Sequence, residues 1–266
     1  MNEDILKKIK QLPPLPESAM QIEAVYQDPD SSFNDMVKIL ESDPLLTADI
    51  LKAANSPLYG FSREINAISQ AVGLFGMGTV RGFALASIVK KSFTLDLSVY
   101  NISNEMFSEL SKRQHALITA WCMKKENKLM GILSPAAFLV EIGKVIIAQQ
   151  IMHDSKEEEF ASTLEELQDV EAAEQKIVGT DTPEVSSTIF KLWKFEDGLV
   201  DTIANCQNPE NAREEDKKAA QILHVVRVTI PINGVATEAS IQAAKELVTK
   251  YSLDMDSFEK ALESAV

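Results

Sequence analysis

Three histidines are the first residues to consider for chemistry, because imidazole and carboxylate groups are good ligands for divalent metals. A pair of metals held in this way can activate a water and neutralise phosphate charge, which is the chemistry of phosphoester hydrolysis. The three histidines are His115, His153 and His224, which lie far apart in the sequence. Only His153 is followed by an aspartate, Asp154, and we expect that pair at a helix end beside a charged linker. The histidines therefore do not predict a catalytic metal centre.

The two cysteines also give no sign of a metal or redox site. Cys122 and Cys206 lie far apart and neither belongs to a Cys-x-x-Cys motif. Buried, reduced thiols are typical of a protein kept in a reducing compartment. We therefore expect a cytoplasmic protein without a disulfide framework and without a cofactor.

Charge excludes one large class of partner. The chain of 266 residues carries a formal charge of −14 and has a pI near 4.7. Binding to a nucleic-acid backbone needs a basic surface, so nucleic acid is not an expected partner. We find no signal peptide at Met1–Lys8 and no run approaching the roughly 18 apolar residues that cross a bilayer, so membrane insertion is not expected either.

The elements that would position any site are predicted to be helices. Ala, Leu, Glu and Lys are abundant, strand-like alternation is almost absent, and most of the 10 glycines and 10 prolines mark helix boundaries. The fold class predicted is all-α. The expected helices are one before Leu12 and then Pro16–Tyr26, Ser32–Ser42, Pro44–Ala54, Ile68–Leu74, Val80–Phe93 with Thr79 as its cap, Glu105–Asn127, Ser134–Met152, Thr163–Ile177, Pro183–Trp193, Gly198–Cys206, Glu214–Val228, Glu238–Tyr251 and Asp256–Ser264.

The helix predicted over Pro44–Ala54 has residues typical of a helix start before it and of a helix end after it. Asp43 can cap the free amides of the first turn, Pro44 fits the first helical position, and Asn55-Ser56-Pro57 ends the helix. Together with Leu12–Pro16 upstream and Ile68–Gly76 downstream, this segment resembles the bacterial HDOD domain. The resemblance runs from Gln11 to about Glu210.

The resemblance implies a signalling module related to the HD and HD-GYP metal-dependent phosphohydrolases but without their metal ligands. The implied architecture is an N-terminal helical bundle packed on a degenerate HD-like helical half. We accordingly divide the chain into residues 1–95 for the bundle, 96–210 for the HD-like half and 211–266 for a C-terminal helical extension.

Matching the family motif residue by residue shows what stands in the metal-ligand positions. Ile142-Gly143-Lys144 matches the family's Ile-Gly-Lys, which places Val140 and Glu141 where His and Asp would stand. Thr182 falls at or near the position of another His, and Cys206 lies where a pair of His is frequent. A valine cannot bind a metal, and we therefore expect no catalytic or metal site. The vestigial HD-site positions are Val140, Glu141, Thr182 and Cys206.

The leading hypothesis is a non-catalytic regulatory protein that acts by binding another protein. The resemblance implies a signalling partner of the kinase, response-regulator or diguanylate-cyclase class. The candidate partner-binding loop contains Asn55, Ser56 and Tyr59, which present polar groups and an aromatic ring at a helix end. A structural alternative remains open, in which Asn55 caps the helix and Tyr59 packs under the loop.

Two other hypotheses belong to different classes. The first is a small-ligand, nucleotide-like sensor that uses the cleft of the former metal site, where Lys144 offers a charge to phosphate. Its candidate residues are Glu141, Lys144, Asp181 and Thr182. The second is a divergent metal-dependent phosphodiesterase, for which the sequence supplies few ligands.

Overall fold

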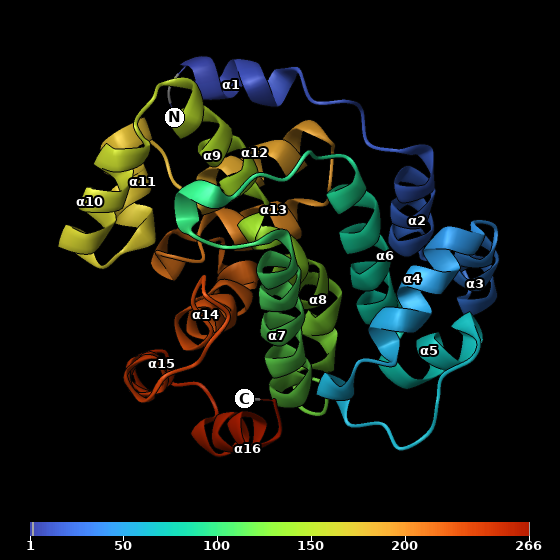
Figure 1. The fold of residues 1–266 in the computed structure, drawn as a ribbon. Helices are drawn as coiled ribbons and strands as arrows, with labels where there is room; N and C mark the ends of the chain where they lie inside the picture. The colour runs from blue at the N-terminus through green and yellow to red at the C-terminus, as the bar shows by residue number, and fades with distance from the viewer. Residues whose placement is uncertain (2, 266) are drawn as a thin grey trace.

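The all-α prediction is confirmed. The computed structural model describes residues 1 and 3–265, which form sixteen α-helices and five short 3-10 helices, with no strand in that part of the chain (Figure 1). The helices gather into two groups joined side by side: a smaller N-terminal bundle on the right of Figure 1 and a larger half on the left.

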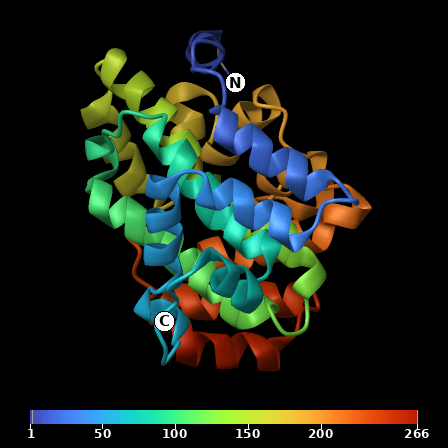
Figure 2. The same cartoon turned by 90° about the vertical axis from the view of Figure 1, so that its right-hand side faces the viewer.

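The N-terminal bundle lies toward the viewer in Figure 2. Its helices are α2 (Glu17–Gln27), α3 (Phe33–Glu41), α4 (Pro44–Ala54), α5 (Ile68–Phe75) and α6 (Met77–Lys91), with the 3-10 helix η1 (Pro57–Tyr59) between α4 and α5. The start of α4 is as predicted, since the Asp43 carboxylate accepts hydrogen bonds from the amides of Leu45 and Leu46 at 2.9 and 3.0 Å. Ser32 and Asp35 form a capping box at the start of α3.

The larger half contains the remaining helices of the chain. They are α1 (Glu3–Lys10), α7 (Asn104–Cys122), α8 (Met130–Leu139), α9 (Gly143–His153), α10 (Glu157–Leu167), α11 (Val170–Val178), α12 (Thr182–Leu192), α13 (Asp197–Ala204), α14 (Glu214–Thr229), α15 (Glu238–Lys250) and α16 (Met255–Ala265), with η2 (Ser98–Tyr100), η3 (Asn127–Leu129), η4 (Val140–Ile142) and η5 (Pro209–Asn211).

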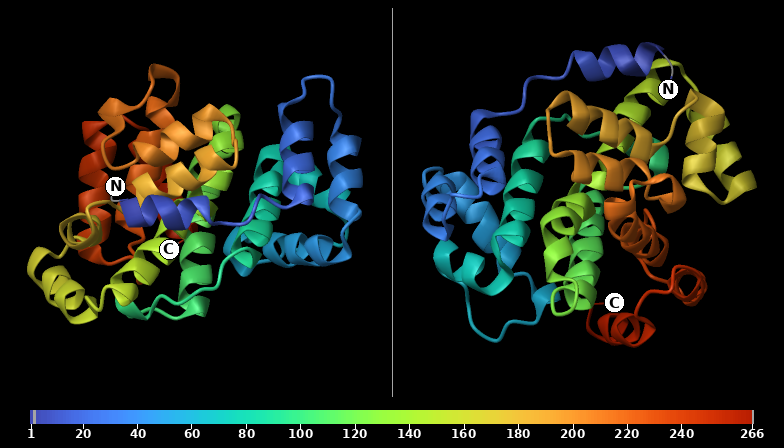
Figure 3. Two further views of the ribbon diagram at one scale, coloured as in Figure 1. Left: turned by 90° about the horizontal axis from the view of Figure 1, so that it is seen from above. Right: turned by 180° about the vertical axis from the view of Figure 1, so that it is seen from behind.

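Helix α1 belongs to this half although it precedes the bundle in the sequence. It packs on α9 and α12, and the view from above in Figure 3 shows the chain crossing from it to the bundle. The indole Nε1 of Trp193, at the end of α12, donates a hydrogen bond to the carbonyl of Pro13 at 3.1 Å and so fixes this crossing. Residues 1–95 are therefore spread over both halves.

Four predicted helices have wrong boundaries. Gly76, with a φ of +80°, is the residue that caps α6, so this helix begins at Met77 rather than after Thr79. The helix predicted over Ser134–Met152 begins earlier, at Met130, and is broken by the 3-10 turn η4. The helix predicted over Glu105–Asn127 is the third case, since α7 ends at Cys122 and Asn127 begins η3.

The fourth case is the acidic region. The sequence predicted one helix from Thr163 to Ile177, and the structure has two, because Gln168 adopts a φ of +52° and ends α10. The carboxylate of Asp169 then accepts a hydrogen bond from the amide of Ala172 and starts α11. The break makes α11 a separate short helix, which carries the fully buried Glu174 and the partly exposed Glu171.

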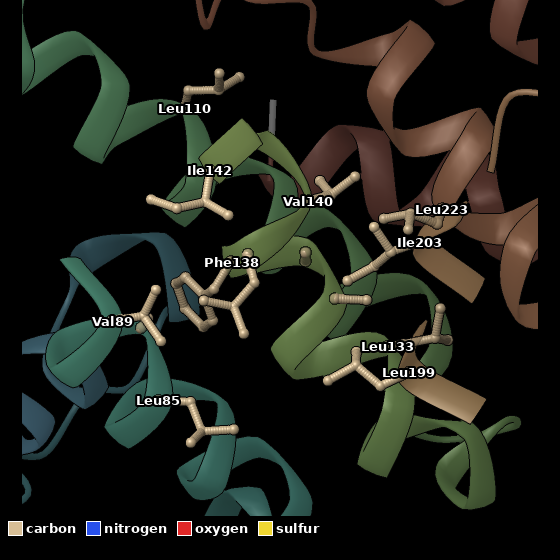
Figure 4. Close-up of a cluster of buried hydrophobic side chains, with 14 of the residues drawn as sticks. Leu85, Val89, Leu110, Leu133, Phe138, Val140, Ile142, Leu199, Ile203 and Leu223 are labelled. Carbon is tan, nitrogen blue, oxygen red and sulfur yellow. The ribbon is translucent and has the colours of Figure 1, made fainter. Parts of the chain in front are cut away.

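One apolar stretch is longer than the sequence analysis recognised. Asn127–His153 is long and apolar enough to span a membrane by composition, with a mean hydropathy of 1.8. In the structure this stretch comprises η3, α8, η4 and α9. Of its most apolar 18-residue segment, 89% is buried inside the protein. Its hydropathy is that of a core segment, whose side chains form part of the cluster in Figure 4.

The two halves join where α6 crosses α8 at very short range. A Cβ atom on Gly78 of α6 would lie 2.8 Å from the Cα of Gly131 on α8, and one on Gly82 would lie 3.1 Å from the amide nitrogen of Pro135. Only glycine allows the two backbones this approach. Figure 4 shows the apolar side chains of both helices, among them Leu85 and Phe138, that fill the rest of the interface.

Candidate functional site

Five charged side chains meet in the interior of the larger half, and we call them the charge network. Glu141 comes from η4 and Lys144 from α9, one turn further along the chain. Glu171 and Glu174 are both on α11, and Arg227 is on α14. Burying charge is unfavourable unless each group finds a partner, so their pairing decides what the site can do.

Lys144 is the centre of the network. Its Nζ lies 3.1 Å from Glu141 Oε2, 3.3 Å from Glu174 Oε1 and 3.8 Å from Glu171 Oε1. It also donates a hydrogen bond to the hydroxyl of Thr182 at 3.0 Å. The lysine side chain is 1% exposed, so its ammonium group is neutralised inside the protein rather than by solvent.

Arg227 is the second cation of the network. Its Nε donates to Glu141 Oε1 at 2.7 Å and its Nη2 to Glu171 Oε1 at 2.5 Å. Its Nη1 lies 3.6 Å from the sulfur of Cys206. Glu141 is therefore held from both sides, by Arg227 through one oxygen and by Lys144 through the other.

Glu174 is fully buried and held by neutral donors as well as by Lys144. Its carboxylate accepts hydrogen bonds from the amide and the hydroxyl of Thr182, both at 2.7 Å, and from the hydroxyl of Tyr100 at 2.8 Å. The Thr182 hydroxyl thus donates to Glu174 while it accepts from Lys144. Through Glu174 these contacts connect four elements, η2, α9, α11 and α12.

The electrostatics follow from this pairing. Burial alone raises the pKa of Glu141, but Arg227 and Lys144 outweigh it and lower that pKa to about 2. Burial likewise lowers the pKa of Lys144, and Glu141, Glu174 and Glu171 reverse this and raise it. For Glu174 burial prevails over Lys144, so its pKa is raised. Two cations and three carboxylates leave the network close to neutral.

The predicted vestigial positions come together only in part. Glu141 and Thr182 are members of the site and the Cys206 thiol touches it, where burial raises the pKa of that thiol to about 11. Val140 lies outside the network, because it is fully buried among the apolar side chains of Figure 4. Asp181 caps α12 by accepting a hydrogen bond from the amide of Glu184 at 2.9 Å.

These residues do not fit a metal ion. The oxygens of Glu141 already face Arg227 and Lys144, whose positive charges would repel a divalent cation. Over residues 1 and 3–265, no group of three or more His, Cys, Asp or Glu side chains is arranged to hold a metal. The site is an ion-pair core in the place where the family resemblance puts metal ligands.

A small pocket lies beside the charge network. It has a volume of about 310 Å³, and Glu141, Lys144 and Arg227 form part of its wall. His224 lines it too, and its Nδ1 lies 2.8 Å from the hydroxyl of Tyr251. Burial is the main cause that lowers the pKa of His224 to about 4, so this imidazole is neutral at neutral pH.

The predicted partner-binding loop is fixed from inside by two of its three residues. The side-chain amide of Asn55 donates to the carbonyls of Leu51 and Ile65, and its oxygen accepts from the amide of Ile65. The hydroxyl of Tyr59 lies 2.6 Å from Nδ1 of the buried His115. Ser56 remains partly exposed at the surface of the loop. Asn55 and Tyr59 thus have the structural roles that the sequence left open.

Sequence reasoning missed Arg227, Glu171, Glu174 and Tyr100. One signal was available for the arginine, since Arg227 interrupts an otherwise apolar run from Ile222 to Val228 apart from His224. A lone charge inside a buried helix face indicates a buried partner. For Glu171 and Glu174 the predicted helix was continuous across Gln168. Because the chain breaks there, the sequence pattern did not show which face of α11 points into the protein.

The fold and this site define an all-helical protein of the HD-like class with a core of buried ion pairs. The family model for the HDOD domain matches residues 12–209. The chain belongs to the HDOD domain family.

Three similar proteins illustrate the relationship. A virulence factor from Campylobacter jejuni is 27% identical, covers 100% of this chain and 97% of its own, and superposes with a TM-score of 0.60. A candidate signal transduction protein from Marinobacter aquaeolei is 22% identical with a TM-score of 0.72, covering 99% of this chain and 59% of its own. An uncharacterized protein of Treponema pallidum is 32% identical over 73 residues, which are 27% of this chain and 14% of that protein.

Proposed function

We propose that this protein is a non-catalytic regulatory component that acts by binding another protein. The observation that carries the proposal is the charge network, in which Lys144 and Arg227 occupy the centre of the vestigial HD site and neutralise its carboxylates. Membership of the HDOD family and the likeness to a candidate signal transduction protein support a regulatory role.

The chemistry of the site supports the absence of phosphohydrolase activity. Metal-dependent hydrolysis needs an open coordination position for water and a cation that stabilises the developing charge on phosphate. Here the ammonium of Lys144 is 1% exposed and surrounded by carboxylates, so it cannot replace a metal ion that binds water and substrate phosphate. We infer that the network stabilises the fold.

The partner in this proposal is a signalling protein of the kinase, response-regulator or diguanylate-cyclase class. A cytoplasmic location belongs to the same proposal and is supported by the free, buried thiols of Cys122 and Cys206. Since Asn55 and Tyr59 hold the loop from inside, the part of the loop offered to a partner is the surface around Ser56.

Affinity capture from native cells, with the full chain as bait, tests the proposal. Three baits are compared: the wild type, Ser56→Arg in the loop, and Ser18→Arg on α2 as a matched control of similar exposure. We expect reproducible recovery of a signalling protein by the wild type and the control, and weaker recovery by Ser56→Arg. Equal recovery by all three baits would remove the loop from the interface, and no specific partner would contradict the proposal.

Catalysis is tested separately on the purified protein. We expect less than about 0.1 metal ion per chain by elemental analysis and no cleavage of phosphodiesters in the presence of added Mn²⁺ or Fe²⁺. Stoichiometric metal with cleavage that Glu141→Gln abolishes would establish the phosphodiesterase alternative. Ligand binding at the vestigial cleft is tested by a thermal-shift panel of nucleotides, in which Lys144→Gln should remove any stabilisation.

A further inference from the structure

A second concave site lies between the two halves, away from the charge network, and we call it the interhalf groove. It has a volume of about 1060 Å³, at the upper end of the range typical of small-molecule sites. Its walls are formed by α4 and residues 55–58 on one side, α6 at the base and the first turns of α7 on the other. The N-terminal bundle and the larger half therefore both contribute to it.

Lys90 is the unusual residue of this groove. From the last turn of α6 its Nζ reaches the hydroxyls of Ser108 and Ser111 on α7, at 3.4 and 3.2 Å, and lies 5.9 Å from the centre of the Phe107 ring. Within the described residues it forms no ion pair. Lys90 is partly exposed, whereas Lys144 is 1% exposed and has three carboxylates beside it, so the two lysines differ in their partners.

A sequestered ammonium group without a counter-charge is unfavourable. Burial, with repulsion from Lys112 as a smaller cause, lowers the pKa of Lys90 to about 8. Nothing in the packing compensates, because the hydroxyls of Ser108 and Ser111 carry no charge. An anion that entered the groove would supply the missing partner.

The other charges of the groove also favour an anion. Its walls include four lysines, Lys52, Lys90, Lys91 and Lys112, against three carboxylates, Asp49, Glu64 and Glu109, which leaves an excess of one positive charge. The chain as a whole carries −14. Two of the carboxylates are engaged, since Asp49 pairs with Lys91 at 2.8 Å and Glu109 with Lys112 at 3.6 Å.

The floor of the groove is aromatic. Phe83 of α6 and Phe138 of α8 line it, with their ring centres 5.6 Å apart, and Figure 4 shows Phe138 directed from α8 toward α6. Behind them the rings of His115 and Phe138 stack at 4.3 Å. Phe83 and Phe138 are only 3% and 6% exposed. Most of the apolar surface open to the groove therefore comes from the partly exposed wall residues Leu51, Ala53 and Leu58. A flat apolar body can bury its area on this wall.

We propose that the interhalf groove binds a small organic anion, a carboxylate or a phosphate ester on an apolar body, with the anionic group at Lys90 and the body on the apolar wall of the groove. An occupant of this kind would touch both halves at once and favour the arrangement that it fits best. Binding at Lys90 can be measured without the proposed partner. The groove wall includes Ser56, on which the proposed partner surface is centred, so occupancy would supply a regulatory input to that function.

Calorimetric titration of the full-length protein with defined probes tests this inference. The two anionic probes are 1-naphthyl phosphate and 1-naphthoate, which distinguish a phosphate from a carboxylate ligand. The two controls are inorganic phosphate, which lacks the apolar body, and 1-naphthol, which lacks the anion. We expect one anionic probe to bind one site per chain with a Kd of about 1 mM or below, and at least about tenfold more weakly to Lys90→Met.

Lys90→Met is expected to fold, because it removes an unpaired charge and keeps the aliphatic stem. Lys90→Gln serves as a second variant, and Lys176→Met, on the exposed face of α11, is the matched control that should bind like the wild type. Absence of saturable binding of both naphthyl anions, equal binding of 1-naphthol, or unchanged affinity in both Lys90 variants would each overturn the inference. None of these results depends on whether a protein partner is found.

Discussion

Single charged residues in this protein matter through the partners they have or lack. Lys144 is buried among three carboxylates, whereas Lys90 is partly exposed in the interhalf groove and faces hydroxyls. The same residue type therefore stabilises the fold in one place and offers a binding contact in the other. Substituting each lysine in turn distinguishes the two roles, because Lys144 has carboxylate partners and Lys90 has none among the residues that the structure describes.

Lys144→Met is expected to destabilise the protein by about 3–5 kcal/mol, because it leaves Glu141, Glu171 and Glu174 buried with Arg227 as their remaining cation. The measurement is the free energy of unfolding from urea denaturation. Lys176→Met, which breaks the exposed pair with Glu166, should cost less than about 1 kcal/mol. Similar costs for the two variants would show that the network does not stabilise the fold.

Acid should weaken the fold through Glu141. Its folded pKa of about 2 lies below its ordinary value of 4.5, so its contribution is fully present above pH 4.5 and is lost as the pH falls toward 2. The separation corresponds to about 3 kcal/mol. Urea unfolding at pH 6, 4 and 3 should therefore show a smaller acid loss in Glu141→Gln than in the wild type. An identical loss in both proteins would contradict this assignment.

The sequence located only part of the charge network. Glu141, Lys144 and Thr182 could be found because they belong to motifs that are contiguous in the chain. Arg227 is 83 residues from Lys144, and no local spacing relates the two. Their pairing depends on how α14 packs across the larger half, which a sequence pattern does not specify.

At the scale of elements, the joint between α6 and α8 depends on glycines. Gly78→Ala is expected to cost about 1–3 kcal/mol, because the new methyl would meet the Gly131 backbone and force the helices apart. Gly73→Ala on α5 is the control, since a Cβ there meets nothing within 4 Å and should stabilise the helix by about 0.5–1 kcal/mol. Thermal unfolding followed by circular dichroism measures both, and a gain in stability for Gly78→Ala would refute the close approach.

Helix identities were predictable where capping and apolar spacing agree, as at Ser32 and Asp43. The boundary between α10 and α11 was not predicted, because a residue there adopts a positive φ that its type does not require. Gln168 is that residue, and without it α10 and α11 would read as one helix. Gly76 is a different case, because a glycine can end one helix and begin the next at the same position.

For the whole molecule, the match to the family model ends at residue 209, but the packed core continues beyond it. Helix α14 buries Leu223, Val225 and Val226 completely and brings Arg227 to the charge network. A chain shortened to residues 1–210 should therefore lose cooperative thermal unfolding. A chain of residues 1–235 keeps α14 and should remain folded with a lower Tm. Cooperative unfolding of the shorter chain at the Tm of the full-length protein would show that α14 does not contribute to the stability of the core.

The course of α1 has a mechanical consequence for the molecule. The N-terminal bundle is connected to the larger half at both of its ends, through residues 11–16 and 92–103, and the contact between Trp193 and Pro13 anchors the first connection. A body with two tethers cannot swing freely as it would on a single linker. The close packing of α6 on α8 is a third attachment between the bundle and the larger half, so any change in their relative orientation has to be accommodated at all three places.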